Sequence, residues 1–163
     1  MAAPREFRLL FLCTGNSARS QMAEAILNHH GRGRFRAESA GSKPAACVNP
    51  LAIETLREYG IEWRGHPPRT VDGLEREPWD FVITVCDRAK ETCPIFPGQP
   101  VLAHWGMADP AEAVGEAANR AFREAYLLLA RRIDLLLALP IEKLEGLALE
   151  ARLRTIGGNT APA

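Results

Sequence analysis

The sequence predicts an α/β protein, a single doubly wound domain in which helices flank a central four-stranded parallel sheet. Two short runs carry this prediction. The apolar run at 7–12 is typical of a buried strand, and the β-branched run at 80–85 has the same character. Segments with helical patterns separate the predicted strands. That alternation favours parallel pairing through crossover helices.

The elements of the N-terminal half follow from local signals. The first strand ends at the turn residues 14–16, and a helix is predicted over 17–31 because Ala, Met, Glu and Leu are frequent there. An alternating stretch at 35–40 predicts the second strand. Asn49 and Pro50 indicate the start of a helix over 51–59, and Gly60 indicates its end.

The C-terminal half contains the third strand at 80–85 and a shorter fourth strand at 100–105. A long helix is predicted from residue 111 or later to residue 139, and a last amphipathic segment covers 141–154. The final residues are rich in Gly, Asn, Thr and Pro. We therefore expect one catalytic domain over 1–155 and a flexible tail over 156–163.

The composition excludes several functions. Lys plus Arg number 20 and Asp plus Glu number 20, so neither nucleic acid nor an anionic membrane is an expected partner. No apolar run approaches the ~20 residues of a membrane span, and residues 1–6 lack the apolar stretch of a signal peptide. We expect a cytoplasmic monomer. In that reducing compartment its four cysteines indicate catalysis, redox chemistry or metal binding, unless they are packing residues.

The loop after the first strand has the residues of an oxyanion site with a nucleophile. Cys13 ends the strand, and Arg19 follows six positions later at a helix start. Such a helix end presents unpaired N–H groups, and Arg19 adds a bidentate donor. Those positive groups predict a Cys13 pKa well below its ordinary value. The alternative is a buried cysteine followed by a surface arginine. The predicted oxyanion-binding residues are Thr14, Gly15, Asn16, Ser17, Ala18, Arg19 and Ser20.

Gly15 and Asn16 are the residues of this loop that tolerate positive φ angles, which a tight anion-binding turn requires. Ser20 is expected to donate a hydrogen bond to the Cys13 sulfur. The first expectation concerns the shape of the loop, and the second adds to the stabilisation of the Cys13 thiolate.

Cys86 and Cys93 follow the predicted third strand, separated by six residues. That spacing matches neither a CxxC redox motif nor a zinc site, and both cysteines can be packing residues. Cys86 nevertheless lies where the sheet aims residues at the Cys13 loop, and Arg88 and Lys90 favour thiolates. In a helix this spacing separates the two Cα atoms by about 10 Å, more than the ~7 Å limit for a disulfide. A Cys86–Cys93 disulfide therefore predicts a rearrangement of residues 87–94.

Asp109 follows the fourth strand and is the candidate proton donor, because hydroxide leaves an oxyanion poorly without protonation. The alternative is a helix N-cap, since Pro110 comes next. Ala111 and Glu112 follow. The loop after the fourth strand, the third polar loop, therefore offers an acid without tyrosines directly after it.

These motifs resemble those of the low-molecular-weight protein tyrosine phosphatase superfamily, which includes the thioredoxin-coupled arsenate reductases. The Cys13 loop resembles the phosphate-binding loop of that superfamily. Gln21 resembles the reductase branch, since phosphatases usually carry Pro there. Reductases also carry two cysteines at the spacing of Cys86 and Cys93. The phosphatases often place tyrosines after the Asp-Pro of the third loop, so their absence here favours a small inorganic substrate.

The resemblance covers residues 9–157 and implies arsenate reduction for arsenic detoxification. Cys13 attacks arsenate, Cys86 attacks Cys13 and releases arsenite, and Cys93 then attacks Cys86. Thioredoxin re-reduces the Cys86–Cys93 bridge as electron donor, with no bound cofactor. Arg19 binds the oxyanion, with phosphate or sulfate as analogues, and Asp109 is the general acid.

Alternatives remain open at this stage. A phosphatase would use Cys13, Arg19 and Asp109 alone, and a reductase of this kind can have weak phosphatase activity. Glutathione and glutaredoxin can replace thioredoxin, and a non-catalytic oxyanion-binding module is a third possibility. No role is predicted for Cys47. No metal site is predicted. Three residues nevertheless resemble positions that bind a potassium ion in some relatives: Asn16, Glu24 and Ser39.

Overall fold

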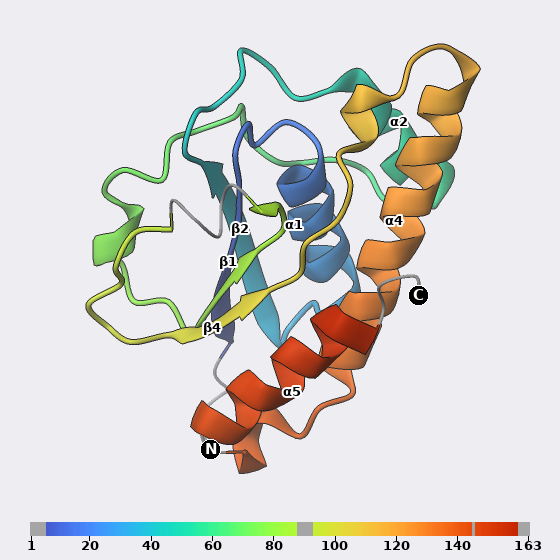
Figure 1. The fold of residues 1–163 in the computed structure, drawn as a ribbon. Helices are drawn as coiled ribbons and strands as arrows, with labels where there is room; N and C mark the ends of the chain where they lie inside the picture. The colour runs from blue at the N-terminus through green and yellow to red at the C-terminus, as the bar shows by residue number, and fades with distance from the viewer. Residues whose placement is uncertain (1–5, 88–92, 145, 160–163) are drawn as a thin grey trace.

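The computed structural model describes residues 6–87, 93–144 and 146–159 (Figure 1). Four parallel strands form one sheet in the order β2-β1-β3-β4, which confirms the predicted α/β class and the four-stranded parallel sheet. The strands are β1 (Phe7–Cys13), β2 (Phe35–Gly41), β3 (Phe81–Thr84) and β4 (Val101–His104).

Helices flank the sheet, as predicted. In Figure 1, α1, α2 and α4 pack together beside the sheet, whereas α5 lies along β4 and contacts α4. Among the described residues, no helix is both long and apolar enough to cross a membrane. The α-helices are α1 (Arg19–His30), α2 (Pro50–Glu58), α4 (Glu116–Leu137) and α5 (Gly146–Asn159). The 3-10 helices are η1 (Leu74–Arg76), η2 (Pro110–Glu112) and η3 (Ile141–Lys143).

A cluster of three phenylalanines lies at the end of the sheet opposite the polar loops. The apolar run in β1 is buried because the strand has neighbours on both sides and side chains packed on both faces. Rings of Phe7, Phe35 and Phe81 meet at centroid distances of 5.6 and 5.9 Å, near the start of three neighbouring strands. This cluster packs the amino-terminal ends of these strands together, whereas the polar loops follow their carboxyl ends.

The strand order reverses at β1. The chain passes from β1 to β2 on one side, and later strands add on the other side through β3. In doubly wound sheets the crevice beyond this switch point is the usual ligand site. Cys13 ends β1, and Cys86 follows β3 by two residues, so the topology brings both cysteines to this crevice.

The predicted flexible tail over 156–163 is wrong for residues 156–159, because α5 continues to Asn159. Ile156 is 7% exposed, and the carbonyl of Gly157 accepts a hydrogen bond from Arg132 Nη2 at 3.1 Å. These contacts outweigh the low helix propensity of two successive glycines. Residues 160–163 lie outside the described part of the chain.

Candidate oxyanion and thiol site

The loop between β1 and α1 has one residue in the left-handed region. Asn16 has a φ angle of 51°, as predicted, whereas Gly15 is not among the positive-φ residues, so that half of the prediction is wrong. Helix α1 begins at Arg19, and its N-cap residue Ala18 supplies no side-chain cap. The first N–H groups of α1 are therefore available to an anion, together with the positive end of the helix dipole.

The carbonyls of this loop are turned away from the crevice by the segment after β2. Backbone N–H groups of that segment donate to four loop carbonyls. Because C=O and N–H point in opposite directions in a trans peptide, the loop N–H groups are directed toward the crevice. The four pairs are Ser42 N to Cys13 O at 3.3 Å, Lys43 N to Thr14 O at 3.0 Å, Ala45 N to Gly15 O at 2.9 Å and Asn49 N to Ser17 O at 2.8 Å.

Gly41 makes this bracing possible. A Cβ atom at Gly41 would stand 2.4 Å from the carbonyl oxygen of Thr14 and 3.1 Å from the amide nitrogen of Asn16. Both neighbours are backbone atoms and cannot turn aside. The end of β2 therefore requires glycine because the loop lies directly against it.

A cleft of about 410 Å³ opens over the loop. Arg19 crosses it, with Nη1 donating to the carbonyl of Met107 at 3.0 Å and Nη2 lying 3.6 Å from Asp109 Oδ2. The buried Nε of Arg19 has no hydrogen-bond partner among the described residues, which leaves it available to an oxyanion. The residues lining the cleft are Cys13, Thr14, Gly15, Ser17, Ala18, Arg19, Cys86, Asp87, Met107, Asp109 and Glu112.

Two predicted oxyanion-binding residues lie behind the cleft instead of lining it. Asn16 and Ser20 are fully buried, and Asn16 Nδ2 donates to Ser20 Oγ at 2.8 Å. Ser20 thus supports the loop from below, while the backbone N–H of Asn16 hydrogen-bonds to the sulfur of Cys13. The side chains of both residues fix the shape of the loop and do not reach a ligand in the cleft.

Cys13 and Cys86 are hydrogen-bonded to each other at the base of the cleft. Thr14 Oγ1 lies 3.3 Å from the sulfur of Cys86. The hydrogen bond to Cys86 and burial raise the pKa of Cys13 above its ordinary value, and Arg19 and the Asn16 N–H only partly oppose them. The prediction of a lowered Cys13 pKa is therefore wrong for this state, because it considered only the positive groups of the loop and left out the effects of burial and of the neighbouring thiol.

Asp109 forms the N-cap of η2 and also lines the cleft. Its Oδ1 accepts a hydrogen bond from the Ala111 N–H at 3.0 Å, which caps η2. Its Oδ2 lies in the cleft beside Arg19. Arg132, which is fully buried, holds the same loop by donating to the carbonyls of Trp105 and Gly106 at 2.9 and 3.2 Å.

Cys93 does not line this cleft. It borders a neighbouring cavity of about 440 Å³ along β3 and β4, together with Thr84 and His104. Burial raises the pKa of Cys93, and none of the four cysteines forms a disulfide. The predicted rearrangement of residues 87–94, and the proposed effect of Arg88 and Lys90, concern residues 88–92, which lie outside the described residues. Cys47 is exposed.

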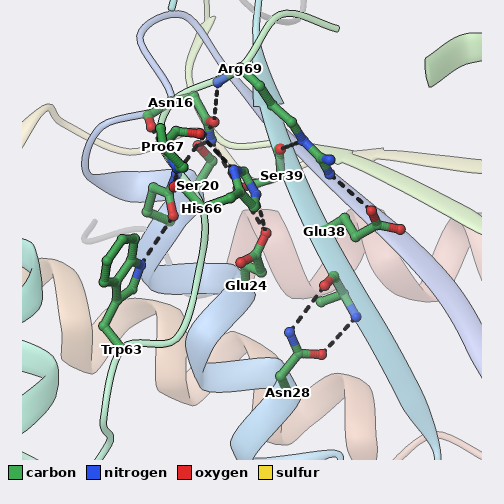
Figure 2. A network of polar contacts seen from close by, with 12 residues as sticks. Asn16, Ser20, Glu24, Asn28, Glu38, Ser39, Trp63, His66, Pro67 and Arg69 are labelled. Carbon is green, nitrogen blue, oxygen red and sulfur yellow. Dashed lines mark hydrogen bonds and ion pairs between the residues drawn. The ribbon is translucent and has the colours of Figure 1, made fainter. Parts of the chain in front are cut away.

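A buried polar network under the loop was not predicted as a whole (Figure 2). Asn16 Oδ1 accepts from the backbone N–H of Arg69 at 3.1 Å, and Gln21 Nε2 donates to the carbonyl of His66 at 3.0 Å. Gln21 is the residue that marked the reductase branch. His66 and Arg69 carry no local motif, because their partners are more than forty residues away in the chain. In the described part of the chain, no three His, Cys, Asp or Glu side chains cluster as a metal site would require.

The fold and the site define a cysteine-based protein that handles tetrahedral oxyanions at the switch point of a parallel sheet. Residues 8–145 match the family described as low molecular weight phosphotyrosine protein phosphatase. The chain belongs to this family. It is also 39% identical over 107 residues to an arsenate reductase of Halalkalibacterium halodurans, across 66% of this chain and 76% of that protein.

Two solved structures agree with this assignment. A structure described as an arsenate reductase in the phosphate binding state has a TM-score of 0.71 at 27% identity, over 81% of this chain and 97% of that one. A thioredoxin-dependent arsenate reductase from Corynebacterium glutamicum has a TM-score of 0.60 at 28% identity, over 82% of this chain and 61% of that one. The relatives by sequence and by structure thus include reductases within a phosphatase family.

Proposed function

We propose that this protein is an arsenate reductase that uses a Cys13, Cys86 and Cys93 relay and is re-reduced by thioredoxin in the cytoplasm. The observation that carries the proposal is the hydrogen-bonded pair of Cys13 and Cys86 under Arg19 and Asp109. A phosphatase needs a single nucleophile, whereas reduction needs a second thiol that can reach the first. The names of the relatives by sequence and by structure support the same conclusion.

In the first step the loop N–H groups and Arg19 hold arsenate over Cys13. Their positive charge favours the Cys13 thiolate once the substrate has been bound and the proton has moved to Cys86 or the oxyanion. The Cys13 sulfur attacks arsenic, and the departing hydroxide takes a proton from Asp109 and leaves as water. The product is a covalent adduct between Cys13 and arsenic(V).

In the second step the Cys86 thiolate attacks the sulfur of Cys13. A Cys13–Cys86 disulfide forms, and the electron pair of the broken sulfur–arsenic bond reduces arsenic(V) to arsenic(III), which leaves as arsenite. Thr14 Oγ1, 3.3 Å from the Cys86 sulfur, is placed to stabilise the attacking thiolate. Two thiols have then supplied the two electrons.

In the third step the Cys93 thiolate attacks Cys86 and releases Cys13. The Cys86–Cys93 bridge then passes its oxidising equivalents to a dithiol protein, for which we propose thioredoxin, because one structural relative is described as thioredoxin-dependent. Cys93 lies in a separate cavity in the reduced protein, so this step requires the segment between the two cysteines to move.

The proposal is tested by NADPH oxidation that depends on arsenate, in the presence of thioredoxin and thioredoxin reductase. A parallel reaction with glutathione and glutaredoxin identifies the electron donor. The Cys93→Ser variant should complete one turnover and then stop with a Cys13–Cys86 disulfide, detected by mass spectrometry. Sustained turnover of Cys93→Ser with thioredoxin would contradict the relay, and Cys47→Ser is the matched control.

The same cleft fits phosphate monoesters, so we propose weak phosphatase activity as a side reaction. Hydrolysis of p-nitrophenyl phosphate should need Cys13 and Arg19 but should persist in Cys86→Ser and Cys93→Ser. A protein with strong phosphatase activity and no arsenate-dependent turnover would instead be a phosphatase.

A further inference from the structure

Arg132 lies in α4 and is fully buried, although none of the proposed chemical steps uses it. Burial lowers the pKa of its guanidinium, because the charged form loses its surrounding water. Such a cation is costly to bury unless acceptors surround it. Three backbone carbonyls accept from it. Nη1 donates to Trp105 O at 2.9 Å and to Gly106 O at 3.2 Å, and Nη2 donates to Gly157 O at 3.1 Å. One side chain therefore joins the loop after β4 to the end of α5.

The loop that Arg132 holds, residues 105–109, ends at Asp109. Its first two carbonyls accept from Arg132, and the third, that of Met107, accepts from Arg19 Nη1 at 3.0 Å. Two arginines thus hold three successive carbonyls, Arg19 from the cleft and Arg132 from the side of α4. The position of the carboxyl group two residues later depends on these contacts.

Side-chain packing does not hold this loop on the side of α4. A pocket of about 460 Å³ lies between residues 106–110 and the side chains of α4, and Arg132 is one of the residues that line it. A loop packed closely against a helix would be fixed by that packing. Here the pocket leaves space, so the hydrogen bonds from Arg132 are the fixed contacts between α4 and the start of the loop.

Helix α5 supports the same loop from a third direction. It lies along β4 (Figure 1) and follows residues 8–145, which match the family. The indole Nε1 of Trp105 donates to Leu153 O at 3.1 Å. A Cβ atom at Gly157 would stand 2.6 Å from the carbonyl oxygen of His104, so glycine is what allows α5 to lie this close to the end of β4. The loop that carries Asp109 therefore rests on a helix outside the matched part of the chain.

We propose that Arg132 is a positioning residue for Asp109: together with α5 it holds the loop so that the carboxyl group stays in the cleft. The inference rests on the proposed role of Asp109 as general acid, and it does not depend on Cys86 or Cys93. Proton transfer requires the acid within hydrogen-bond reach of the leaving oxygen. A displaced loop would slow protonation, whereas the loop after β1 would still bind the anion.

The test compares Arg132→Met with Arg131→Met, a matched control at an exposed neighbouring position of α4. Arg132→Met keeps the apolar stem and removes the donors. We expect kcat/KM for arsenate to fall roughly tenfold to a hundredfold, because small displacements of reacting groups have effects of this size. The phosphate dissociation constant, measured by calorimetry, should change little. Arg131→Met should behave like wild type in both measurements.

The Asp109→Asn background separates positioning from general structural support. Once the acid has been removed, Arg132→Met should have little further effect on kcat/KM. An equal loss in both backgrounds would overturn the inference, and so would an unchanged kcat/KM in Arg132→Met alone. If Arg132→Met does not fold, as judged by circular dichroism, Arg132→Lys replaces it in the same comparison. Lysine keeps the charge but lacks the planar fork that reaches both the loop and Gly157, so we expect the same pattern with a smaller loss.

Hydrolysis of two phosphate monoesters gives a second readout that needs no thiol relay. Phenyl phosphate has a poorer leaving group than p-nitrophenyl phosphate and therefore depends more on the acid. Arg132→Met should lose more kcat/KM toward phenyl phosphate, and equal losses toward the two esters would contradict the inference. A wild-type protein that hydrolyses both esters without turning over arsenate would count against the proposed reductase function, while the two esters would still decide the role of Arg132.

Discussion

Cys13, the last residue of β1, and Cys86, two residues after the neighbouring strand β3, are hydrogen-bonded to each other in the oxyanion cleft. This contact is the largest cause of the raised Cys13 pKa, ahead of burial. In the reduced protein this contact and burial both disfavour the Cys13 thiolate, next to the thiol with which we propose Cys13 later forms a disulfide.

We predict that Cys86→Ala lowers the Cys13 pKa, because it removes the largest contribution that raises it and leaves those of Arg19 and the Asn16 N–H. The rate of Cys13 alkylation by iodoacetamide, followed peptide by peptide against pH, measures this pKa. The alkylation curve should move to lower pH in the variant. Cys47→Ala is the control, since Cys47 is exposed and lies outside the cleft. A curve that stays in place would show that burial alone protects the thiol.

We predict that Gly41→Ala weakens phosphate binding and destabilises the fold. The added methyl group would lie 2.4 Å from the Thr14 carbonyl oxygen, so the loop must move away from β2. Overpacking of this kind costs about 1–3 kcal/mol, and the displaced loop loses its bracing hydrogen bonds. Urea unfolding and phosphate calorimetry measure the two effects. Gly98→Ala is the matched control, because nothing lies within 4 Å of its added methyl group.

Much of the fold was predictable because its signals are local. The apolar runs of β1 and β3 identify buried strands, and Asn49 with Pro50 identifies the start of α2. The end of α5 was not predictable in this way. Two glycines mark a helix end by propensity, whereas the buried Ile156 and the Arg132 hydrogen bond that hold the helix depend on distant residues.

The residues of the site show the same difference between local signals and contacts of distant residues. Cys13, Arg19, Cys86 and Asp109 lie in motifs of a few residues, and the structure places all four on one cleft. His66 has no motif, and its place in the polar network under the loop depends on a contact with Glu24 that spans 42 positions in the chain. The direction of the Cys13 pKa was missed for the same reason. No local pattern specifies how closely two loops approach each other.

We predict that the stability of the protein decreases in acid partly through Glu38. Burial would raise the pKa of Glu38, but hydrogen bonds from Arg8 at 2.7 Å and Arg69 at 3.0 Å outweigh it and lower the pKa. A carboxyl whose pKa is lower in the folded state stabilises the fold above its unfolded pKa. That contribution is lost as the pH falls through the lowered value.

Urea unfolding across the acid range measures this effect. In Glu38→Gln the free energy of unfolding should be smaller near neutral pH and should fall less steeply in acid. Glu62→Gln is the control, because Glu62 forms its ion pair with Arg64 at a highly exposed position. Parallel acid profiles for wild type and Glu38→Gln would assign the acid sensitivity to other carboxyls.

We predict that two substitutions of Asp109 separate its capping role from its proposed role as general acid. Asparagine caps a helix about as well as aspartate, so Asp109→Asn should keep the hydrogen bond to the Ala111 N–H and most of the stability. It cannot donate the proton, and kcat for arsenate should fall by about 10²–10⁴-fold. Asp109→Ala should lose a similar factor in kcat and also the cap, at a cost of ~1 kcal/mol in the free energy of unfolding.

Steady-state kinetics and urea unfolding of both variants check this separation. Asp109 also lies 3.6 Å from Arg19 Nη2, so its neutralisation frees positive charge for the oxyanion. Phosphate should therefore bind Asp109→Asn at least as tightly as wild type, although turnover is slow. Normal kcat in Asp109→Asn would mean that water or another group protonates the leaving oxygen, and the Asp-Pro pair would then be a helix cap alone.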